Sequence, residues 1–340
     1  MKAAVLHELR QPYRIEDVPR PQIGPGEVLV ETHTCGLCGT DMHIQDGLAY
    51  VPELPFIPGH EAAGVVTEVA NDVTSLQVGQ RVVPHNFVTC DECLYCRSGR
   101  HAQCLKVLGI FGVSLPGGFA EYFKMPAKNL FVLPENVPFD TGGLVSCAVI
   151  TAVHAYRRSR INANDAVVVI GSGGIGQLMI QILKFAGAKV IALSRTDASL
   201  KRGQQVGADL GVLADAKDAQ KQIKDFTDGN GAHCAFDTVG TAATMKVAAE
   251  SVMQGGQIIV IGEEPDFPAI DTIQIAQREL EIIGSRNGGF QDAIDALEMM
   301  SDGIIQPLVA ERFSLDDFNA AMDCLRSGKA HGRIVISIKD

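Results

Sequence analysis

The sequence has no run of about 20 apolar residues, the length that crosses a bilayer, and its first segment, Met1 to Arg20, is charged and polar. We therefore expect neither a membrane span nor a secretory signal, and a cytoplasmic location is the default. Basic residues are in the minority, with 29 Lys and Arg against 40 Asp and Glu and a formal net charge of -11. Such a surface repels nucleic acid and anionic lipid, so neither is an expected partner.

Internal repeats and low-complexity tracts are also missing. A content of 46% hydrophobic and 20% charged residues is ordinary for a globular protein and unlike that of disordered chains. At 340 residues the chain exceeds what one hydrophobic core usually organises, so two domains are expected. The nine cysteines would suggest disulfides in a secreted protein, but their clustering in a chain of cytosolic character favours metal binding.

Composition and the pattern of apolar residues divide the chain into three stretches. Residues 1–151 are rich in Gly and Pro with short β-type runs such as 27–32, 64–69 and 81–84, which predicts an irregular, mostly β domain. Residues 152–284 alternate apolar runs with helical segments, which predicts βαβ units around a parallel sheet of six strands. Residues 285–340 combine helical segments at 291–301 and 315–327 with a closing strand at 332–338. The predicted fold class is α/β.

A glycine-rich turn follows the first apolar run of the second stretch. After residues 166–170 the chain reads Gly171-Ser172-Gly173-Gly174-Ile175-Gly176, and a helix-forming segment comes next. Gly171 permits a tight turn, Gly173 lets the backbone approach a pyrophosphate, and Gly176 allows the helix to pack closely on the strand. The N–H groups at the start of the helix would bind the pyrophosphate. A glycine-rich turn without a ligand is the alternative.

The end of the next apolar run indicates which dinucleotide binds. An NAD site usually carries Asp or Glu there to bond the adenosine ribose, whereas this chain reads Ser194-Arg195-Thr196. A carboxylate repels a 2′-phosphate, and a small hydroxyl followed by a guanidinium binds one. NADP(H) is therefore expected in preference to NAD(H). The alternative is that Arg195 is a solvated surface residue and Asp197 takes the acidic role.

Four cysteines, Cys90, Cys93, Cys96 and Cys104, lie close together in the first stretch. Four thiolates in one short loop satisfy the tetrahedral geometry of a structural zinc and leave no position for a substrate. An iron–sulfur cluster and a set of reduced thiols are the alternatives. A zinc ribbon that reads nucleic acid is disfavoured, because the loop has few basic groups on an acidic protein.

Three more segments occur in a fixed order with these two motifs: Cys38 in CGLCGTD, His60 in PGHE and Cys147 in LVSCAVIT. Over essentially its whole length the chain resembles the zinc-dependent alcohol dehydrogenases of the medium-chain dehydrogenase/reductase family. The resemblance implies two zinc ions per chain. It also implies reversible hydride transfer between an alcohol, or its aldehyde or ketone, and NADP(H) or NAD(H).

The same resemblance implies a domain arrangement. A GroES-like, mostly β catalytic domain would comprise residues 1–151, with the structural-zinc loop at 90–104, and the returning residues 285–340. A Rossmann dinucleotide-binding domain with a doubly wound parallel sheet would occupy residues 152–284. Association through this second domain into a homodimer or homotetramer is implied as well.

By resemblance, Cys38, His60 and Cys147 bind the catalytic zinc and leave a fourth position for water or substrate. Glu61 would lie beside the zinc as a transient ligand. Asp41 would hold the His60 ring and fix its tautomer. For Cys147 the alternative is a small buried hydrophobic residue.

Four further roles are implied by resemblance. Thr40 would bond the substrate oxygen, and His43 would end a proton relay, since an imidazole titrates near neutral pH. Thr151 would contact the nicotinamide, and Arg333 would reach the pyrophosphate. For His43 the alternative is a surface histidine without a part in turnover.

Two other functions stay open. A polyol, sugar or hydroxyacyl dehydrogenase would use the same zinc chemistry, because substrate choice depends on pocket residues that the sequence does not assemble. A non-catalytic zinc protein that senses a dinucleotide would bind cofactor without turnover, and the open ligand set around Cys38 argues against it.

Overall fold

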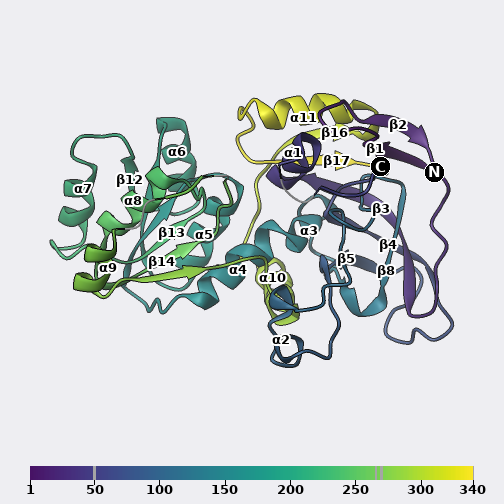
Figure 1. Cartoon of the computed structure of the whole chain (residues 1–340), viewed down its shortest axis with the longest axis horizontal. Helices are drawn as coiled ribbons and strands as arrows, with labels where there is room; N and C mark the ends of the chain where they lie inside the picture. The colour runs from purple at the N-terminus through teal and green to yellow at the C-terminus, as the bar shows by residue number, and fades with distance from the viewer. Residues whose placement is uncertain (49–50, 265, 269–270, 340) are drawn as a thin grey trace. The chain divides into compact units, whose positions relative to one another are not determined.

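The computed structural model describes residues 1–48, 51–264, 266–268 and 271–339. The chain divides into two compact units, residues 1–150 with the chain from 288 onward, and residues 151–287. The divisions predicted from the sequence follow residues 151 and 284. Helix α4 (Ala148–Arg158) begins in the first unit and continues into the second (Figure 1). No described helix is long and apolar enough to cross a membrane.

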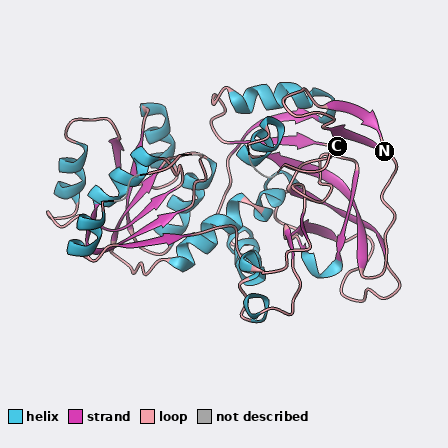
Figure 2. Cartoon of the chain, viewed as in Figure 1, coloured by secondary structure: helices cyan, strands magenta, loops and turns pink. Residues whose placement is uncertain are grey.

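The second unit is built on one parallel sheet (Figure 2). Its strands are β10 (Ala166–Ile170), β11 (Lys189–Ser194), β12 (Leu210–Leu213), β13 (Ala232–Asp237), β14 (Val252–Val260) and β15 (Glu281–Gly284). Its helices are α5 (Gly174–Phe185), α6 (Asp197–Gln205), α7 (Ala219–Phe226), α8 (Ala242–Ser251) and α9 (Thr272–Arg278). The strands lie in the order β12-β11-β10-β13-β14-β15 and every pairing is parallel. This is the doubly wound Rossmann arrangement, so the prediction of six parallel strands is confirmed.

The strand order also locates the ligand-binding edge. β10 is buried at all five positions, as expected for a parallel strand that is covered on both faces. The strand order reverses between β10 and β13, and open α/β sheets bind ligands at the carboxyl ends of the strands beside such a reversal. Gly171 follows β10 at that edge, and Asp237 ends β13 there.

The first unit holds a sheet of seven strands in the order β16-β17-β3-β4-β5-β9, with β8 also paired to β3. The strands of the whole unit, which include the separate pairs β1-β2 and β6-β7, are β1 (Lys2–Val5), β2 (Arg14–Asp17), β3 (Glu27–Leu37), β4 (Glu61–Val69), β5 (Arg81–Pro84), β6 (Phe87–Val88), β7 (Gly109–Ile110), β8 (Tyr122–Pro126), β9 (Leu130–Val132), β16 (Val309–Ser314) and β17 (Arg333–Ser337). Its helices are α1 (Gly39–Asp46), α2 (Leu94–Arg97), α3 (Phe139–Gly142), α10 (Phe290–Ser301) and α11 (Phe318–Arg326), with single 3₁₀ turns η1 (His101–Gln103), η2 (Ala127–Asn129), η3 (Gly143–Ser146) and η4 (Leu315–Asp317). The mostly β character of this unit was predicted.

Two antiparallel pairings bring distant parts of the chain to one place. β17 pairs with β3, with Ile334 opposite Leu37. β3 also pairs with β4, with Gly36 opposite Glu61. The closing strand, the end of β3 and the start of β4 are therefore neighbours.

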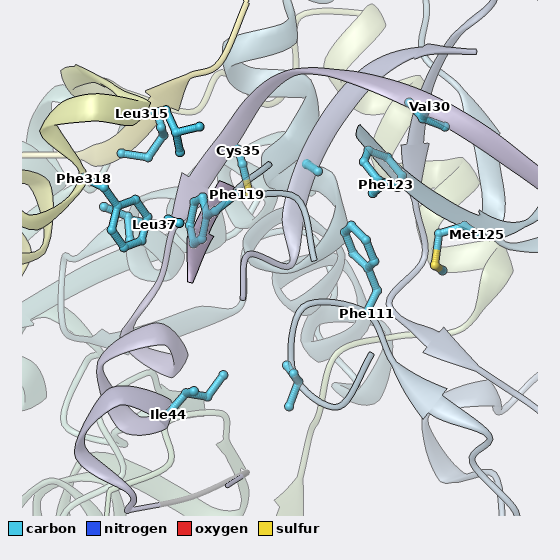
Figure 3. Packing of buried hydrophobic residues seen from close by; sticks show 14 of the residues in the cluster. Val30, Cys35, Leu37, Ile44, Phe111, Phe119, Phe123, Met125, Leu315 and Phe318 are labelled. Atoms are coloured by element: carbon cyan, nitrogen blue, oxygen red, sulfur yellow. The ribbon is translucent and has the colours of Figure 1, made fainter. Parts of the chain in front are cut away.

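Aromatic rings fill the core beside these strands (Figure 3). The rings of Phe119 and Phe318 meet edge-on at 4.7 Å, and those of Phe111 and Phe123 lie 4.8 Å apart. All four side chains are at most 2% exposed. Such close packing holds the strand ends, and the side chains that they carry, in fixed positions.

Candidate functional site

Two thiols, an imidazole and a carboxylate gather at the strand ends just described. One donor atom from each of Cys38, His60, Glu61 and Cys147 lies within 4.8 Å of all the others. Cys38 stands between β3 and α1, and His60 directly precedes β4, which begins with Glu61. Cys147 comes from the junction of η3 and α4. Such a mixed sulfur, nitrogen and oxygen set has the ligand chemistry of a zinc site.

Asp41, which is not one of the four donors, contacts two of them. Its Oδ2 accepts a hydrogen bond from the backbone N–H of Cys38 at 2.8 Å. Its Oδ1 lies 3.6 Å from Nδ1 of His60. Burial raises the pKa of the Asp41 carboxyl, and His60 opposes that shift. Because Asp41 faces Nδ1, the other ring nitrogen of His60, Nε2, is left to bind a metal.

The two thiols of the cluster cannot both ionise easily on their own. Their Sγ atoms are 4.0 Å apart. A hydrogen bond from Cys147 holds the pKa of Cys38 well below its usual range, and the same contact raises that of Cys147. A cation between the sulfurs would allow both to be thiolates, which is the form that binds metal. The donor set therefore fits a divalent ion.

Glu61 is fully buried and paired to the closing strand. Nη2 of Arg333 donates hydrogen bonds to Oε2 of Glu61 and, at 3.1 Å, to the carbonyl oxygen of Leu37. Oε1 of Glu61 has no hydrogen-bond partner among the described residues. Burial raises the pKa of Glu61 to about 7, and Arg333 works against that shift. The predicted contact of Arg333 with the pyrophosphate stays a prediction.

Thr40 and His43 lie on α1, directly after Cys38. Oγ1 of Thr40 is 3.8 Å from Sγ of Cys38. His43 stands three residues further along the same helix, so it shares a face with Thr40, and its side chain is half-buried.

The four clustered cysteines form a second compact donor set. Sγ of Cys90 lies 3.5 Å from that of Cys104 and 4.0 Å from that of Cys96, and the Sγ atoms of Cys93 and Cys96 are 3.5 Å apart. A tetrahedron with Zn–S distances of about 2.3 Å has edges of about 3.8 Å. Backbone N–H groups, first that of Cys96, lower the pKa of the Cys93 thiol to about 6. This geometry fits four thiolates around one zinc.

The glycine-rich turn has the shape expected of a dinucleotide-binding loop. Gly171 has φ +90, and a Cβ on Gly176 would lie 1.8 Å from the carbonyl oxygen of Gly171. A Cβ on Gly173 would meet no atom within 4 Å. Gly174 and Ile175 begin α5 immediately after this residue. The backbone at Gly173 is thus open to a ligand while Gly176 seals helix against strand.

Three more predicted cofactor residues lie in the second unit. Ser194 ends β11 and is buried, with its Oγ 3.0 Å from Oγ of Ser172. Arg195 follows it and is exposed. Thr151 lies on α4 and is 7% exposed.

A group of buried polar residues was not predicted from the sequence, and one of them contacts the chain directly before Cys147. His85, Asn86 and Asn129 are at most 2% exposed. Asn86 donates from Nδ2 to the carbonyl oxygen of Ser146 at 2.8 Å. The polar pair His85-Asn86, placed between the apolar runs of β5 and β6, was the one available signal.

A dinucleotide-binding sheet in the same chain as a thiol-rich cation site is the combination found in metal-dependent dehydrogenases. Comparisons with known proteins agree. Residues 24–135 match the model of the alcohol dehydrogenase GroES-like domain, and residues 174–302 match that of the zinc-binding dehydrogenase domain.

Individual relatives extend over the whole chain. An alcohol dehydrogenase of Geobacillus stearothermophilus is 34% identical over 99% of this chain and 100% of its own. An NAD-dependent alcohol dehydrogenase of Sulfolobus acidocaldarius is 28% identical over 99% of this chain and 100% of its own. The crystal structure of the alcohol dehydrogenase of Aeropyrum pernix superposes with a TM-score of 0.92 at 31% identity, covering 99% of this chain and 100% of that one.

The chain therefore belongs to the zinc-dependent alcohol dehydrogenases of the medium-chain dehydrogenase/reductase family. It is a zinc-dependent oxidoreductase that acts on a small-molecule alcohol or its carbonyl product with a nicotinamide dinucleotide. The family and the reaction class expected from the sequence are confirmed.

Proposed function

We propose that Cys38, His60 and Cys147 hold the catalytic zinc of this alcohol dehydrogenase and that Glu61 is a transient ligand. The observation that carries the proposal is the cluster of four donors within 4.8 Å of one another, in which His60 and Glu61 are buried and the two cysteines are half-buried. When bound, zinc supplies a Lewis acid and the dinucleotide supplies the hydride acceptor or donor. Asp41 orients the His60 ring, and Arg333 keeps Glu61 next to the two thiols.

Metal analysis of single variants tests the ligand assignment. Cys147→Ala should retain one zinc per chain, held by the cysteine-rich loop, and should lose alcohol oxidation. Cys35→Ala is the matched control, because Cys35 is a buried thiol near the cluster that is not among the four donors. It should keep two zinc ions and activity. Undiminished activity of Cys147→Ala after loss of one zinc would refute the assignment.

We infer that Thr40 and His43 handle the proton of the substrate hydroxyl. Thr40 is within 3.8 Å of Cys38 and so beside the proposed metal position. Its hydroxyl can accept the substrate proton while donating its own, and His43 on the same helix face receives the proton at an imidazole nitrogen. His43→Gln should lower the rate most at low pH and should be rescued by added buffer base. An unchanged pH profile would exclude the relay.

We infer further that the enzyme prefers NADP(H). The support is local: β11 ends in a serine where a carboxylate would repel a 2′-phosphate, and an exposed arginine follows. Asp197, the residue that could take the acidic role, is the exposed first residue of α6.

The cofactor preference is tested by kcat/KM with NADP and NAD across a panel of alcohols and aldehydes. Ser194→Asp should shift the preference toward NAD. Ser199→Asp adds the same charge inside α6 rather than at the strand end and should shift it less. A native preference for NAD that Ser194→Asp leaves untouched would overturn this inference.

Association into a homodimer or homotetramer through the second unit is part of the same proposal. β15 is the last strand of its sheet, and Ile282 on it is 39% exposed. Light scattering of the purified chain measures the assembly directly, and a monomer would contradict the proposal.

A further inference from the structure

The side chain of Asn86 is a buried carboxamide that contacts the backbone directly before Cys147, a proposed zinc ligand. Asn86 follows β5 and is 2% exposed. Its Nδ2 donates to the carbonyl oxygen of Ser146 at 2.8 Å. A carbonyl oxygen only accepts, so the amide must present its nitrogen to Ser146. The carbonyl of Ser146 and the N–H of Cys147 belong to one rigid peptide plane. The hydrogen bond from Asn86 therefore fixes the plane from which the Cys147 side chain departs.

The local backbone needs such a support. Cys147 has φ -133 and ψ -73, outside the helical region, and interrupts the chain between η3 and α4. Its own N–H is 3.4 Å from the carbonyl oxygen of Leu144, near the upper limit of a hydrogen bond. By comparison, the 2.8 Å contact of Asn86 is short. The orientation of the Cys147 peptide thus depends on Asn86 more than on the preceding turn.

Asn86 is itself held firmly. Its backbone carbonyl oxygen accepts a hydrogen bond from the N–H of Phe111 at 2.9 Å, whereas its side-chain Oδ1 has no hydrogen-bond partner among the described residues. Asn129 donates from Nδ2 to the carbonyl oxygens on both sides of it, those of His85 at 3.0 Å and Phe87 at 2.8 Å. The donor that orients the Cys147 peptide is therefore part of a backbone segment between β5 and β6 that hydrogen bonds hold on both sides.

We propose that Asn86 is a positioning residue for the Cys147 ligand of the catalytic metal. It sets the direction of the Cα–Cβ bond of Cys147, which places Sγ 4.0 Å from Sγ of Cys38. This inference rests on the proposed role of Cys147 as a zinc ligand. Outer residues that orient metal ligands typically contribute about 10- to 100-fold to metal affinity.

Asn86→Leu removes the donor and keeps the approximate volume. The test measures release of zinc to a chelator, together with the absorption spectrum after replacement of zinc by Co(II), whose bands report the geometry of its ligands. The zinc at Cys38, His60 and Cys147 should be lost about 10- to 100-fold faster than from the native protein, and the cobalt spectrum should change. Zinc in the cysteine-rich loop should be released at the native rate. Asn86→Ser, whose hydroxyl is too short to span the contact, serves where the leucine variant does not fold and should behave in the same way.

Gln257→Leu is the matched control, since Gln257 is also a buried, hydrogen-bonded carboxamide, on β14 of the second unit. It should lower thermal stability without moving the cobalt spectrum. A native spectrum and a native release rate in folded Asn86→Leu or Asn86→Ser would overturn the inference, as would an equal spectral change in Gln257→Leu. If Cys147→Ala keeps both zinc ions, the ligand assignment itself fails; if it loses one while the Asn86 variants stay native, the positioning role alone fails.

Discussion

Arg333 donates from Nη2 to Oε2 of Glu61, and this ion pair joins the closing strand to the start of β4 inside the protein. The side chains are 12% and 0% exposed. Glu61 borders the two thiols that we assign to the zinc, so a negative charge there adds to theirs. Arg333 compensates part of that charge, which leaves less negative charge for the proposed zinc to balance.

Removal of Arg333 alone should lower the free energy of unfolding more than removal of Arg333 together with the charge of Glu61. Arg333→Leu leaves a buried carboxylate unpaired, which typically costs about 3–5 kcal/mol. The double variant Arg333→Leu with Glu61→Gln removes the stranded charge and should recover part of that loss. Lys339→Leu, which breaks the more exposed pair of Lys339 with Glu31, should cost about 1 kcal/mol or less. Urea unfolding at neutral pH measures all three, and equal losses for Arg333→Leu and Lys339→Leu would contradict this account.

Two glycines of the dinucleotide turn should respond differently to the same substitution. Gly176→Ala places a methyl group 1.8 Å from a backbone oxygen, so it should destabilise the protein by about 3 kcal/mol or more. Gly173→Ala meets no neighbour within 4 Å and its φ of -78 suits alanine, so its thermal midpoint should stay close to native. The methyl group of Gly173→Ala should instead weaken dinucleotide binding, because it stands where the pyrophosphate approaches.

Calorimetric titration with dinucleotide and thermal unfolding separate these effects. Native affinity in Gly173→Ala would show that the pyrophosphate lies elsewhere, whereas a native thermal midpoint in Gly176→Ala would show that helix and strand can separate without cost.

Local patterns predicted the parallel sheet, its glycine turn and the cysteine loop, because each depends on residues close together in sequence. Contacts between distant residues were not predictable in this way. Glu61 and Arg333 are 272 residues apart, and Asn86 and Ser146 are 60 apart. Such pairs can be predicted only once the order of the strands in the sheet is known.

Element boundaries show the same limit. The β-type run read at 27–32 extends as β3 to Leu37, because pairing with β4 and β17 continues past the obvious alternation. That extension carries the chain up to Cys38 and so determines where the first of the proposed ligands stands. The helical segment read at 315–327 begins instead with the 3₁₀ turn η4, and α11 starts at Phe318.

His85 should make stability depend on pH. Burial lowers its pKa from 6.5 to about 4, although a contact of 3.0 Å between Nε2 and the carbonyl oxygen of Gly288 opposes the shift. Between pH 6.5 and 4 the unfolded chain therefore binds a proton that the folded chain does not, and stability falls as the pH falls. From pH 7.5 to 5.5 the contribution lost is about 1 kcal/mol.

His85→Phe cannot titrate, so the difference in unfolding free energy between it and the native protein should shrink by that amount over the same pH range. Phe87→Leu, a buried change nearby that involves no titratable group, should leave the native pH dependence in place. An identical pH dependence in His85→Phe would mean that the folded protein binds this proton as readily as the unfolded chain, so that burial does not lower the pKa of His85.

Substitution of one cysteine in the cysteine-rich loop should release the metal of that loop and leave the proposed catalytic zinc in place. In Cys104→Ser a hydroxyl replaces one of four thiolates, and a tetrahedral zinc site tolerates such a change poorly. We expect one zinc per chain instead of two, a lower thermal midpoint, and alcohol oxidation that persists at moderate temperature because Cys38, His60 and Cys147 are intact. Cys324→Ser, at a half-buried cysteine of α11, should keep both ions. Iron with sulfide in the native protein, and its disappearance in Cys104→Ser, would instead identify the loop as an iron–sulfur site, because zinc has no redox chemistry and brings no inorganic sulfide with it.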